Sequence, residues 1–365
     1  MKRIAVFLGH PAHYHMFKNM VAQLESDGYE VSYFIKRKDI LEDLVRESGH
    51  DYVVVRSHER KNAGKLGLAW AMFAMDVKVA YYLIKNKSQL LIGTYAPFLS
   101  HLTNVPMLIT CEDDASVVPL FAKLSYPYAS AIICPTNCDG GKWDSQMIKY
   151  DGFQKLTYLH PNRFVPDKKI VEKYFGTVEK PFFLLRFSRL NAHHDGGVAG
   201  INAEVTQKIV EILEPYGNIY ITSERPLEPQ FEKYRLHIDP LDIHHVMAYA
   251  SIYIGDSQSM AVEAAMLGTP SVRFNDFAGK IGVLEELEQK YQLTKGIPSS
   301  QPQLLYDTIQ EWLSMPNLKE VFQQRRQHML DDKIDVTAFF IWLVKNYPES
   351  KQIMKENPDF QFQFK

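Results

Sequence analysis

The sequence predicts an α/β protein in which two sets of parallel strands and helices follow one another along the chain. Short runs of apolar, β-favouring residues alternate with segments of helical periodicity. Polar or glycine-containing loops follow most of these runs, as they do in βαβ units. The chain has 365 residues, which suits about two domains at roughly 150 residues each.

The first set of elements begins at the N-terminus. Residues 4–8 form a buried type of strand, residues 16–24 show helical spacing, and residues 31–35 form the next strand, which together make a βαβ unit. The same pattern predicts further strands at residues 52–55, 90–92, 107–110 and 131–134.

The loop at residues 9–15 holds Gly9 and three histidines, His10, His13 and His15. Ligands of parallel sheets bind at the carboxyl ends of strands, where this loop lies. A histidine there could act as a general base or contact a substrate, because it titrates near neutral pH. No acidic or cysteine partner stands nearby in sequence, so we expect no metal. The alternative is that one or two of the histidines only cap the helix or pack.

Two further strands should end at the same edge of the sheet as the strand at residues 4–8. Thr94 and Tyr95 follow the strand at residues 90–92. Three consecutive carboxylates, which include Asp113 and Asp114, follow the strand at residues 107–110. These carboxylates could hold a sugar hydroxyl or act as a base, and the alternative is that they are solvated loop residues.

An aromatic and proline-containing passage at residues 151–166 interrupts the pattern, which indicates a passage between domains. We therefore expect one domain at residues 1–165, a second at residues 166–335 and a helical tail at residues 336–365. The second domain repeats the strand–loop–helix design, with strands at residues 182–186, 219–222, 252–254 and 271–274.

Residues 251–272 predict a strand, a polar turn, a helix and another strand. The helix should end at Gly268, with Pro270 beyond it. A helix N-terminus carries unpaired N–H groups and a partial positive charge, so the turn formed by Ser257, Gln258 and Ser259 is suited to phosphate.

Glu263 lies four residues after Ser259 and thus on the same helical face, where it could accept hydrogen bonds from a ribose. The alternative is ordinary N-capping by Asp256, Ser257 or Ser259, with Glu263 merely exposed. Polar residues in the other loops of this domain complete the candidate ligand-binding set, namely Arg186, Ser188, Arg189, His194, Asp195, Ser223 and Glu224.

Composition limits the classes of function. The chain is 46% apolar with a net charge of −2, which is typical of a globular protein and gives no basic excess for nucleic acid. The apolar run at residues 4–8 is too short for a signal peptide, and no run of about 18 uncharged apolar residues predicts a membrane span. Cys111, Cys134 and Cys138 are an odd number without a second pair, which fits a reducing cytoplasm and disfavours disulfides or a zinc site.

Residues 61–87 are mostly helical and carry more apolar side chains than one narrow face can bury. Most of these side chains should belong to the core. An exposed part could rest on a membrane surface, with lysines toward anionic lipid, namely Lys61, Lys65, Lys78, Lys85 and Lys87.

Two successive βαβ domains, joined by this passage and closed by a helical tail, form the outline of the GT-B fold, in which two Rossmann-like domains face a central cleft. The sequence also resembles a family of uncharacterised proteins that are predicted to be GT-B glycosyltransferases and are found near surface-polysaccharide genes. The segments that carry this resemblance are residues 9–19, 158–167, 184–197, 221–224 and 255–273.

Two relatives suggest roles for individual residues. Residues 256–270 are similar to a pattern of the non-hydrolysing UDP-N-acetylglucosamine 2-epimerases, which implies that the Ser257–Ser259 turn meets the nucleotide diphosphate and Glu263 the ribose. The glycine pair of that pattern is here Gln258 and Ser259, and the epimerases' N-terminal arginine-bearing turn is replaced. The first loop and helix instead resemble, in spacing, those of the peptidoglycan N-acetylglucosaminyltransferase, and His13 falls on its proposed base.

The resemblance thus implies a metal-independent glycosyltransferase that uses a UDP-linked sugar as substrate and needs no cofactor. The second domain would bind the donor, Arg186 or Arg189 would stabilise the departing diphosphate, and the first domain would present a glycan or lipid-linked acceptor to His13. We expect the protein in the cytoplasm, and contact of residues 61–87 with the inner membrane face is the alternative to their burial in the core. The alternatives are a sugar-nucleotide 2-epimerase and a non-catalytic carbohydrate-assembly subunit.

Overall fold

The computed structural model describes residues 2–38, 40–56, 64–176, 180–188, 200–279 and 281–365. The chain forms two compact units. Unit 1 consists of Met1–Tyr158 and Lys333–Lys365, and unit 2 of Leu159–Asp332. The sequence placed the boundary at residue 165 and made the tail a separate element, whereas the structure divides the chain after Tyr158 and includes the tail in unit 1.

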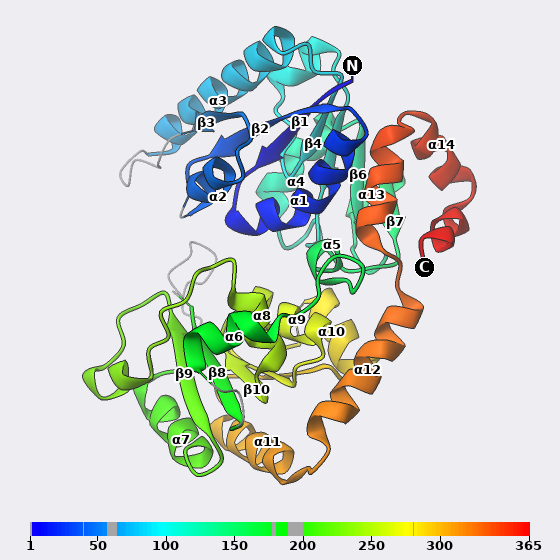
Figure 1. The fold of residues 1–365 in the computed structure, drawn as a ribbon. Coiled ribbons are helices and arrows are strands. Elements are labelled where there is room, and N and C mark those ends of the chain that lie inside the picture. The colour runs from blue at the N-terminus through cyan, green and yellow to red at the C-terminus, as the bar shows by residue number, and fades with distance from the viewer. Residues whose placement is uncertain (1, 39, 57–63, 177–179, 189–199, 280) are drawn as a thin grey trace. The chain divides into compact units, whose positions relative to one another are not determined.

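Unit 1 contains a parallel sheet of seven strands among its described residues, in the order β3-β2-β1-β4-β5-β6-β7 (Figure 1). The strands are β1 (Arg3–Leu8), β2 (Glu30–Lys36), β3 (Tyr52–Arg56), β4 (Leu90–Gly93), β5 (Met107–Thr110), β6 (Ala131–Pro135) and β7 (Met147–Tyr150). The sequence predicted β1 to β6 but missed β7.

The helical elements of unit 1 cover this sheet. They are α1 (Pro11–Ser26), α2 (Leu41–Glu47), α3 (Lys65–Lys85), η1 (Leu99–Thr103), α4 (Pro119–Ser125), η2 (Tyr126–Tyr128), η3 (Gly141–Gln146), α5 (Leu156–Leu159), α13 (Val336–Lys345), α14 (Glu349–Glu356) and η5 (Pro358–Phe364). The inner side of α3 buries Met75, Val79 and Leu83 in one apolar cluster with Phe34 of β2. None of the described helices is both long enough and apolar enough to cross a membrane.

The segment after unit 2 is part of the structure of unit 1. Helix α13 packs against α1. The rings of Phe339 and Phe340 lie 5.9 and 5.5 Å from the ring of Tyr150 at the end of β7. The Thr337 hydroxyl donates to the carbonyl of Thr157 at 2.7 Å. These contacts explain why the tail completes unit 1.

Unit 2 contains a second parallel sheet, in the order β12-β11-β10-β8-β9 among its described residues. Its strands are β8 (Phe182–Phe187), β9 (Asn218–Ser223), β10 (Ile252–Gly255), β11 (Ser271–Phe274) and β12 (Thr294–Ile297), of which the sequence missed β12. Its helical elements are α6 (Lys168–Phe175), α7 (Ala203–Leu213), η4 (Pro229–Tyr234), α8 (Ile243–Tyr249), α9 (Gln258–Leu267), α10 (Gly282–Gln289), α11 (Pro302–Ser314) and α12 (Leu318–Asp332).

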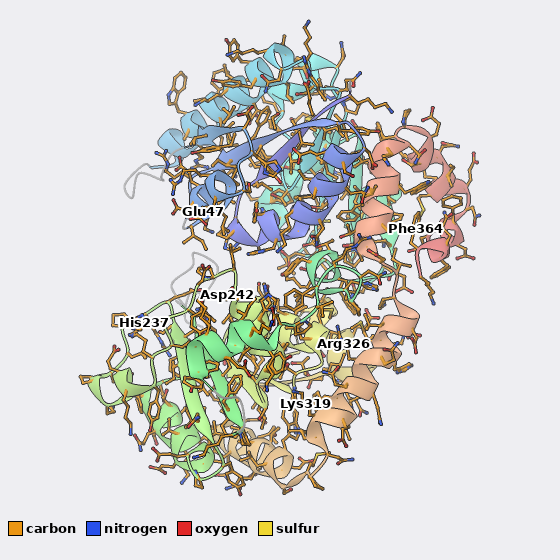
Figure 2. All side chains as sticks on the ribbon, viewed as in Figure 1. Glu47, His237, Asp242, Lys319, Arg326 and Phe364 are labelled. Atoms are coloured by element: carbon orange, nitrogen blue, oxygen red, sulfur yellow. The ribbon has the colours of Figure 1, made fainter. Side chains whose placement is uncertain are left out.

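Helix α9 is held at its C-terminal end. It ends at Gly268, whose φ of 69° is left-handed, as the sequence predicted. From α12, the Arg326 side chain (Figure 2) donates to the carbonyl of Met266 at 2.6 Å, and the Gln323 amide donates to that of Leu267 at 2.9 Å. The last carbonyls of α9 are therefore satisfied by side chains.

In both sheets the strand order reverses at one point. Strands β1, β2 and β3 extend to one side of the unit 1 sheet, while β4 to β7 extend to the other. In unit 2 the reversal lies between β8 and β10. Parallel α/β sheets bind ligands at the carboxyl ends of the strands beside such a switch point. The fold therefore directs attention to the loops after β1 and β4 and to those after β8 and β10.

Candidate functional site

The switch point of unit 1 brings Gly9, His13 and Thr94 together. His10 caps α1, because its Nδ1 accepts from the amide of Ala12 at 3.2 Å. One turn into the helix, Nδ1 of His13 accepts from the amide of Gly9 at 3.1 Å and lies 3.0 Å from the hydroxyl of Thr94. The last contact connects the loops after β1 and β4.

These hydrogen bonds fix the proton of the His13 ring. A backbone amide can only donate, so Nδ1 of the neutral ring is bare and Nε2 carries the proton. Burial, and after it the positive neighbours His10, Lys155 and Lys36, lower the pKa of His13 to about 3. The ring is therefore neutral at physiological pH and offers an N–H donor at Nε2. Nε2 can accept a proton only after the ring has moved its own proton from Nε2 to Nδ1. In that tautomer Nδ1 can no longer accept from the amide of Gly9.

Two residues of unit 1 that the sequence offered as candidate site residues, His15 and Tyr95, are buried and pack in the core. His15 is only 8% exposed, and its ring lies 5.6 Å from that of Tyr158. Tyr95 is also buried, and its hydroxyl donates to Asp76 at 3.2 Å. His10 and His13 are neighbours, with ring centroids 6.0 Å apart, whereas His15 packs elsewhere. In the described part of the chain, no group of histidine, cysteine or carboxylate side chains is arranged to hold a metal ion.

The three carboxylates in the loop after β5 have different surroundings. Glu112 forms an ion pair with Lys155 at 3.1 Å. Asp114 accepts from the amide of Asp139 at 2.7 Å, so it holds a neighbouring loop. Asp113 is exposed to solvent. Desolvation by the surrounding protein, and after it the charge of Glu112, raise the pKa of Asp113, so of the two aspartates predicted as catalytic it is the one with a perturbed carboxyl group.

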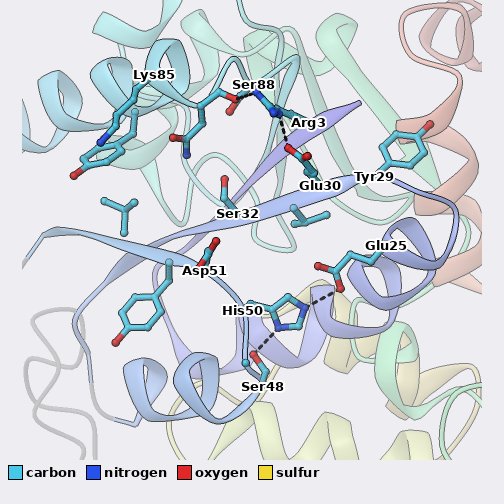
Figure 3. Close-up of a pocket in the computed structure, with 16 residues that line it drawn as sticks. Arg3, Glu25, Tyr29, Glu30, Ser32, Ser48, His50, Asp51, Lys85 and Ser88 are labelled. Carbon is cyan, nitrogen blue, oxygen red and sulfur yellow. Dashed lines mark hydrogen bonds and ion pairs between the residues drawn. The ribbon is translucent and has the colours of Figure 1, made fainter. Parts of the chain in front are cut away.

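A groove of about 1010 Å³ lies at the opposite edge of the unit 1 sheet, beside the amino ends of β1, β2 and β3 (Figure 3). Several of its titratable side chains have partners within the groove. Arg3 pairs with Glu30, and His50 contacts Glu25 at 2.9 Å and Ser48 at 2.7 Å. The groove lies at the amino ends of the strands, whereas the candidate residues lie at the carboxyl ends. We therefore assign no ligand to the groove.

In unit 2, Asp256 joins the two loops of the switch point. It follows β10 and is almost fully buried, and its Oδ1 accepts from both the amide and the hydroxyl of Ser188 after β8, at 2.6 and 2.8 Å. Burial raises the pKa of Asp256, while the Ser188 hydrogen bonds oppose that rise. The sequence suggested Asp256 only as a possible helix cap, although its place directly after a buried strand was a signal.

The N-terminus of α9 lies at the position predicted for phosphate binding. Ser257 is the N-cap, and its hydroxyl accepts from the amide of Met260 at 3.5 Å, which is long for such a bond. Gln258 and Ser259 begin the helix and are partly or fully exposed. The first turn contains no acidic residue. The turn therefore offers polar groups and the positive end of a helix whose first turn carries no carboxylate, with Asp256 immediately before the N-cap.

One turn further, Glu263 is 8% exposed, so the alternative in which it is merely exposed is wrong. Its Oε1 lies 3.4 Å from Nε2 of His244 on α8. His244 could not be recognised from the sequence, because no local pattern relates α8 to α9.

Two arginines lie in one row of the unit 2 sheet, because Arg186 pairs with Gly255 and Gly255 pairs with Arg273. Arg186 forms an ion pair with Glu224, which connects the ends of β8 and β9. Arg273 is fully buried, and burial lowers its pKa while Glu288 and Glu285 oppose the shift. The sequence analysis did not single out Arg273.

Of the remaining residues of unit 2 that were predicted to bind the ligand, the structure describes Ser223 alone. The Ser223 hydroxyl donates to the carbonyl of Arg225 at 2.7 Å and so stabilises its own loop. Arg189, His194 and Asp195 lie outside the described residues. The loops of unit 2 thus bring together Arg186, Ser188, Glu224 and the α9 turn.

Known structures share this fold at low sequence identity. The UDP-GlcNAc 2-epimerase of Neisseria meningitidis, solved with UDP-GlcNAc, has 14% identity and a TM-score of 0.65, with 95% of this chain and 100% of that chain covered. MurG of Acinetobacter baumannii has 13% identity and a TM-score of 0.61, with 94% and 99% covered. The calicheamicin glycosyltransferase CalG4 has 14% identity and a TM-score of 0.59, with 95% and 100% covered. The comparison with curated protein sequences gave no match.

These likenesses confirm the predicted α/β fold, which is the GT-B fold of glycosyltransferases and UDP-sugar epimerases. The matched regions include residues of both units. Residues 3–276 also match the family described as a protein of unknown function, DUF354, which confirms the family resemblance seen in the sequence. The chain belongs to the DUF354 family.

Proposed function

We propose that this protein is a GT-B glycosyltransferase that binds a nucleotide-diphosphate sugar, with UDP as the nucleotide, on unit 2. The turn between β10 and α9 carries the proposal. It combines a helix N-terminus whose first turn contains no acidic residue, the hydroxyl of Ser257 and the carboxylate of Glu263 one turn away. The first two suit a diphosphate and the third suits a ribose.

The proposed reaction joins an acceptor oxygen to the anomeric carbon of the sugar while the bond from that carbon to the diphosphate breaks. The α9 N-terminus and Arg186 stabilise the negative charge of the leaving diphosphate, so that no metal is needed. A base takes the proton of the acceptor hydroxyl. His13 is the proposed base, after transfer of its proton from Nε2 to Nδ1, and Asp113 is the alternative.

The acceptor proposed for unit 1 is a glycan or a lipid-linked glycan in surface-polysaccharide synthesis, at the cytoplasmic side of the membrane. Gly9, His10, Thr94 and His13 would contact it, since they surround the switch point of that unit. The nucleotide sugar is a substrate, and the proposed reaction requires no cofactor.

Thermal unfolding with a panel of nucleotides and sugar nucleotides tests the donor site. A ligand that binds only the folded protein raises its melting temperature by mass action. We expect UDP and UDP-sugars to raise it and the corresponding adenine nucleotides to have no effect at the same concentration. No shift with any UDP compound would contradict the proposal.

An epimerase is the second candidate, because one similar structure is an epimerase solved with UDP-GlcNAc. The two activities separate when the donor is incubated alone in heavy water. An epimerase exchanges the proton at C2 for deuterium, whereas a transferase without acceptor only binds the donor or hydrolyses it slowly. We expect no deuterium at C2. Donor binding without transfer to any acceptor tested would favour a non-catalytic assembly subunit.

A further inference from the structure

Helix α3 presents apolar side chains to solvent along its outer side. Trp70, Phe73, Val77, Tyr81 and Ile84 recur at intervals of three or four residues, so they form one stripe along the helix. Trp70 is 70% exposed and Ile84 65%, and the rings of Trp70 and Phe73 stack with centroids 5.7 Å apart. The opposite side of the same helix is buried in the core.

The neighbouring element η1 also carries exposed apolar side chains. Element η1 packs along α3 and is anchored to it, because Asp76 of α3 accepts from the amide of Phe98 at 3.0 Å. Phe98 is exposed, and Leu102 within η1 is 74% exposed. We call the combined surface the α3 patch: Trp70, Phe73, Val77, Tyr81, Ile84, Phe98 and Leu102. Monomeric proteins rarely leave so many large apolar side chains together in water without a partner.

The charges beside the α3 patch are positive. Lys78 and Lys85 are exposed on the adjoining face of α3, and Lys87 follows the helix. Lys85 lies 5.9 Å from the centroid of the Tyr81 ring. Asp76 is the single acidic residue of α3, and it is buried beneath η1. The described outer face of α3 therefore has no exposed carboxylate to repel an anionic surface.

We propose that the α3 patch binds the surface of an anionic phospholipid bilayer. The apolar stripe enters the boundary between headgroups and acyl chains, and the lysines remain at the phosphates. Tryptophan and tyrosine favour this boundary because their rings combine an apolar body with a polar edge. The lysines are the reason to choose a lipid surface over a second copy of the chain, whose identical lysines would approach one another. This inference goes beyond the proposed reaction and does not depend on it.

Flotation of the full chain with vesicles tests the proposal. We expect the protein to float with vesicles that contain phosphatidylglycerol and to remain at the bottom with vesicles of phosphatidylcholine alone. The variant Trp70→Ser/Phe73→Ser/Ile84→Ser should lower partitioning by about tenfold or more, because it removes three large apolar contacts. Its folding should be intact, since all three side chains are exposed.

Matched controls separate the patch from general surface effects. The double variant Val165→Ser/Tyr216→Ser removes exposed apolar side chains of unit 2 and should float like the native protein. Lys85→Glu/Lys87→Glu should weaken binding on the order of tenfold, and added salt should weaken native binding. Trp70 fluorescence should shift to shorter wavelength with anionic vesicles, and Trp70→Phe should abolish that shift.

Three results would overturn the proposal. The first is native protein that does not float with anionic vesicles at low salt. The second is equal flotation of the triple variant and the native protein. The third is a dimer in the absence of lipid that the triple variant abolishes, since a second copy would then be the occupant of the patch.

Discussion

At the residue scale, His13 has two roles that can be tested separately. It is the proposed base, and its Nδ1 also accepts a hydrogen bond from the amide of Gly9. His13→Asn places an acceptor oxygen near the former Nδ1 but has no Nε2. We expect both His13→Asn and His13→Ala to lower turnover by about 10²–10⁴, the usual worth of general-base assistance. Donor affinity should change little, because the donor is proposed to bind unit 2. The assay needs a working acceptor.

The outcome that would contradict this assignment is equally specific. If His13→Asn turned over normally while Asp113→Asn did not, the base would be Asp113. The Nδ1 contact of His13 would then serve only to join the loops after β1 and β4.

The low pKa of His13 predicts that unit 1 loses stability in acid. Between the folded value of about 3 and the ordinary value of 6.5, the unfolded state binds more protons than the folded state. The free energy of unfolding should therefore fall as pH drops below about 6.5, and His13 should have no effect above that pH. Urea unfolding of His13→Asn at several pH values should show a shallower decline. His237→Asn, at an exposed histidine (Figure 2), should match the native protein.

Glu263 gives the residue-scale test of the donor site. Glu263→Ala should weaken UDP binding by about 1–3 kcal/mol in calorimetry, which is the scale of a lost hydrogen bond to a charged group. Because Glu263 also contacts His244, Glu263→Gln serves as the variant that keeps its shape. Unchanged affinity in Glu263→Ala, with the fold intact, would remove Glu263 from the site.

At the element scale, the contact between α12 and α9 predicts a cost to unit 2. Arg326→Met keeps most of the side chain but removes the donor to the carbonyl of Met266. We expect a loss of roughly 1–3 kcal/mol in the free energy of unfolding. Gln324→Ala, at an exposed position of the same helix, is the control. Equal stability of the two variants would show that water replaces the arginine without cost.

The sequence predicted elements well where local pattern determines them. The end of α9 at Gly268 followed from a glycine with proline beyond it, and the strands beside both switch points were clear apolar runs. Strands β7 and β12 were missed because each has four residues and a lysine within it, so neither shows an apolar run. The sequence predicted most apolar side chains of α3 to lie in the core, and this was wrong for Trp70, Phe73 and Tyr81, which are exposed, since periodicity cannot say which apolar face remains uncovered.

The candidate site was only partly predictable for a related reason. Sequence identified the loops, because polar residues after buried strands are a local signal. It could not show that His13 contacts Thr94, 81 residues away, or that Asp256 holds Ser188, 68 residues away. Those contacts follow from strand order, which depends on the packing of the entire sheet.

At the scale of the whole molecule, unit 2 is one continuous segment while unit 1 is built from two. Deletion of residues 333–365 removes the partner of α1 and the aromatic contacts of Tyr150. We expect the shortened chain to retain a folded unit 2 with its UDP-dependent thermal shift and to lose the cooperative unfolding of unit 1. Calorimetry resolves this result as the loss of one transition. Two intact transitions would show that the tail is dispensable.

The return of the tail to unit 1 also sets an order for synthesis on the ribosome. Leu159–Asp332 emerges entire before Lys333–Lys365, so unit 2 can fold during translation while unit 1 waits for α13. During that interval the buried face of α1 has no α13 to cover it. Newly made chains should therefore depend on chaperones to protect unit 1, and premature termination after residue 332 would yield a folded unit 2 attached to an unfinished unit 1.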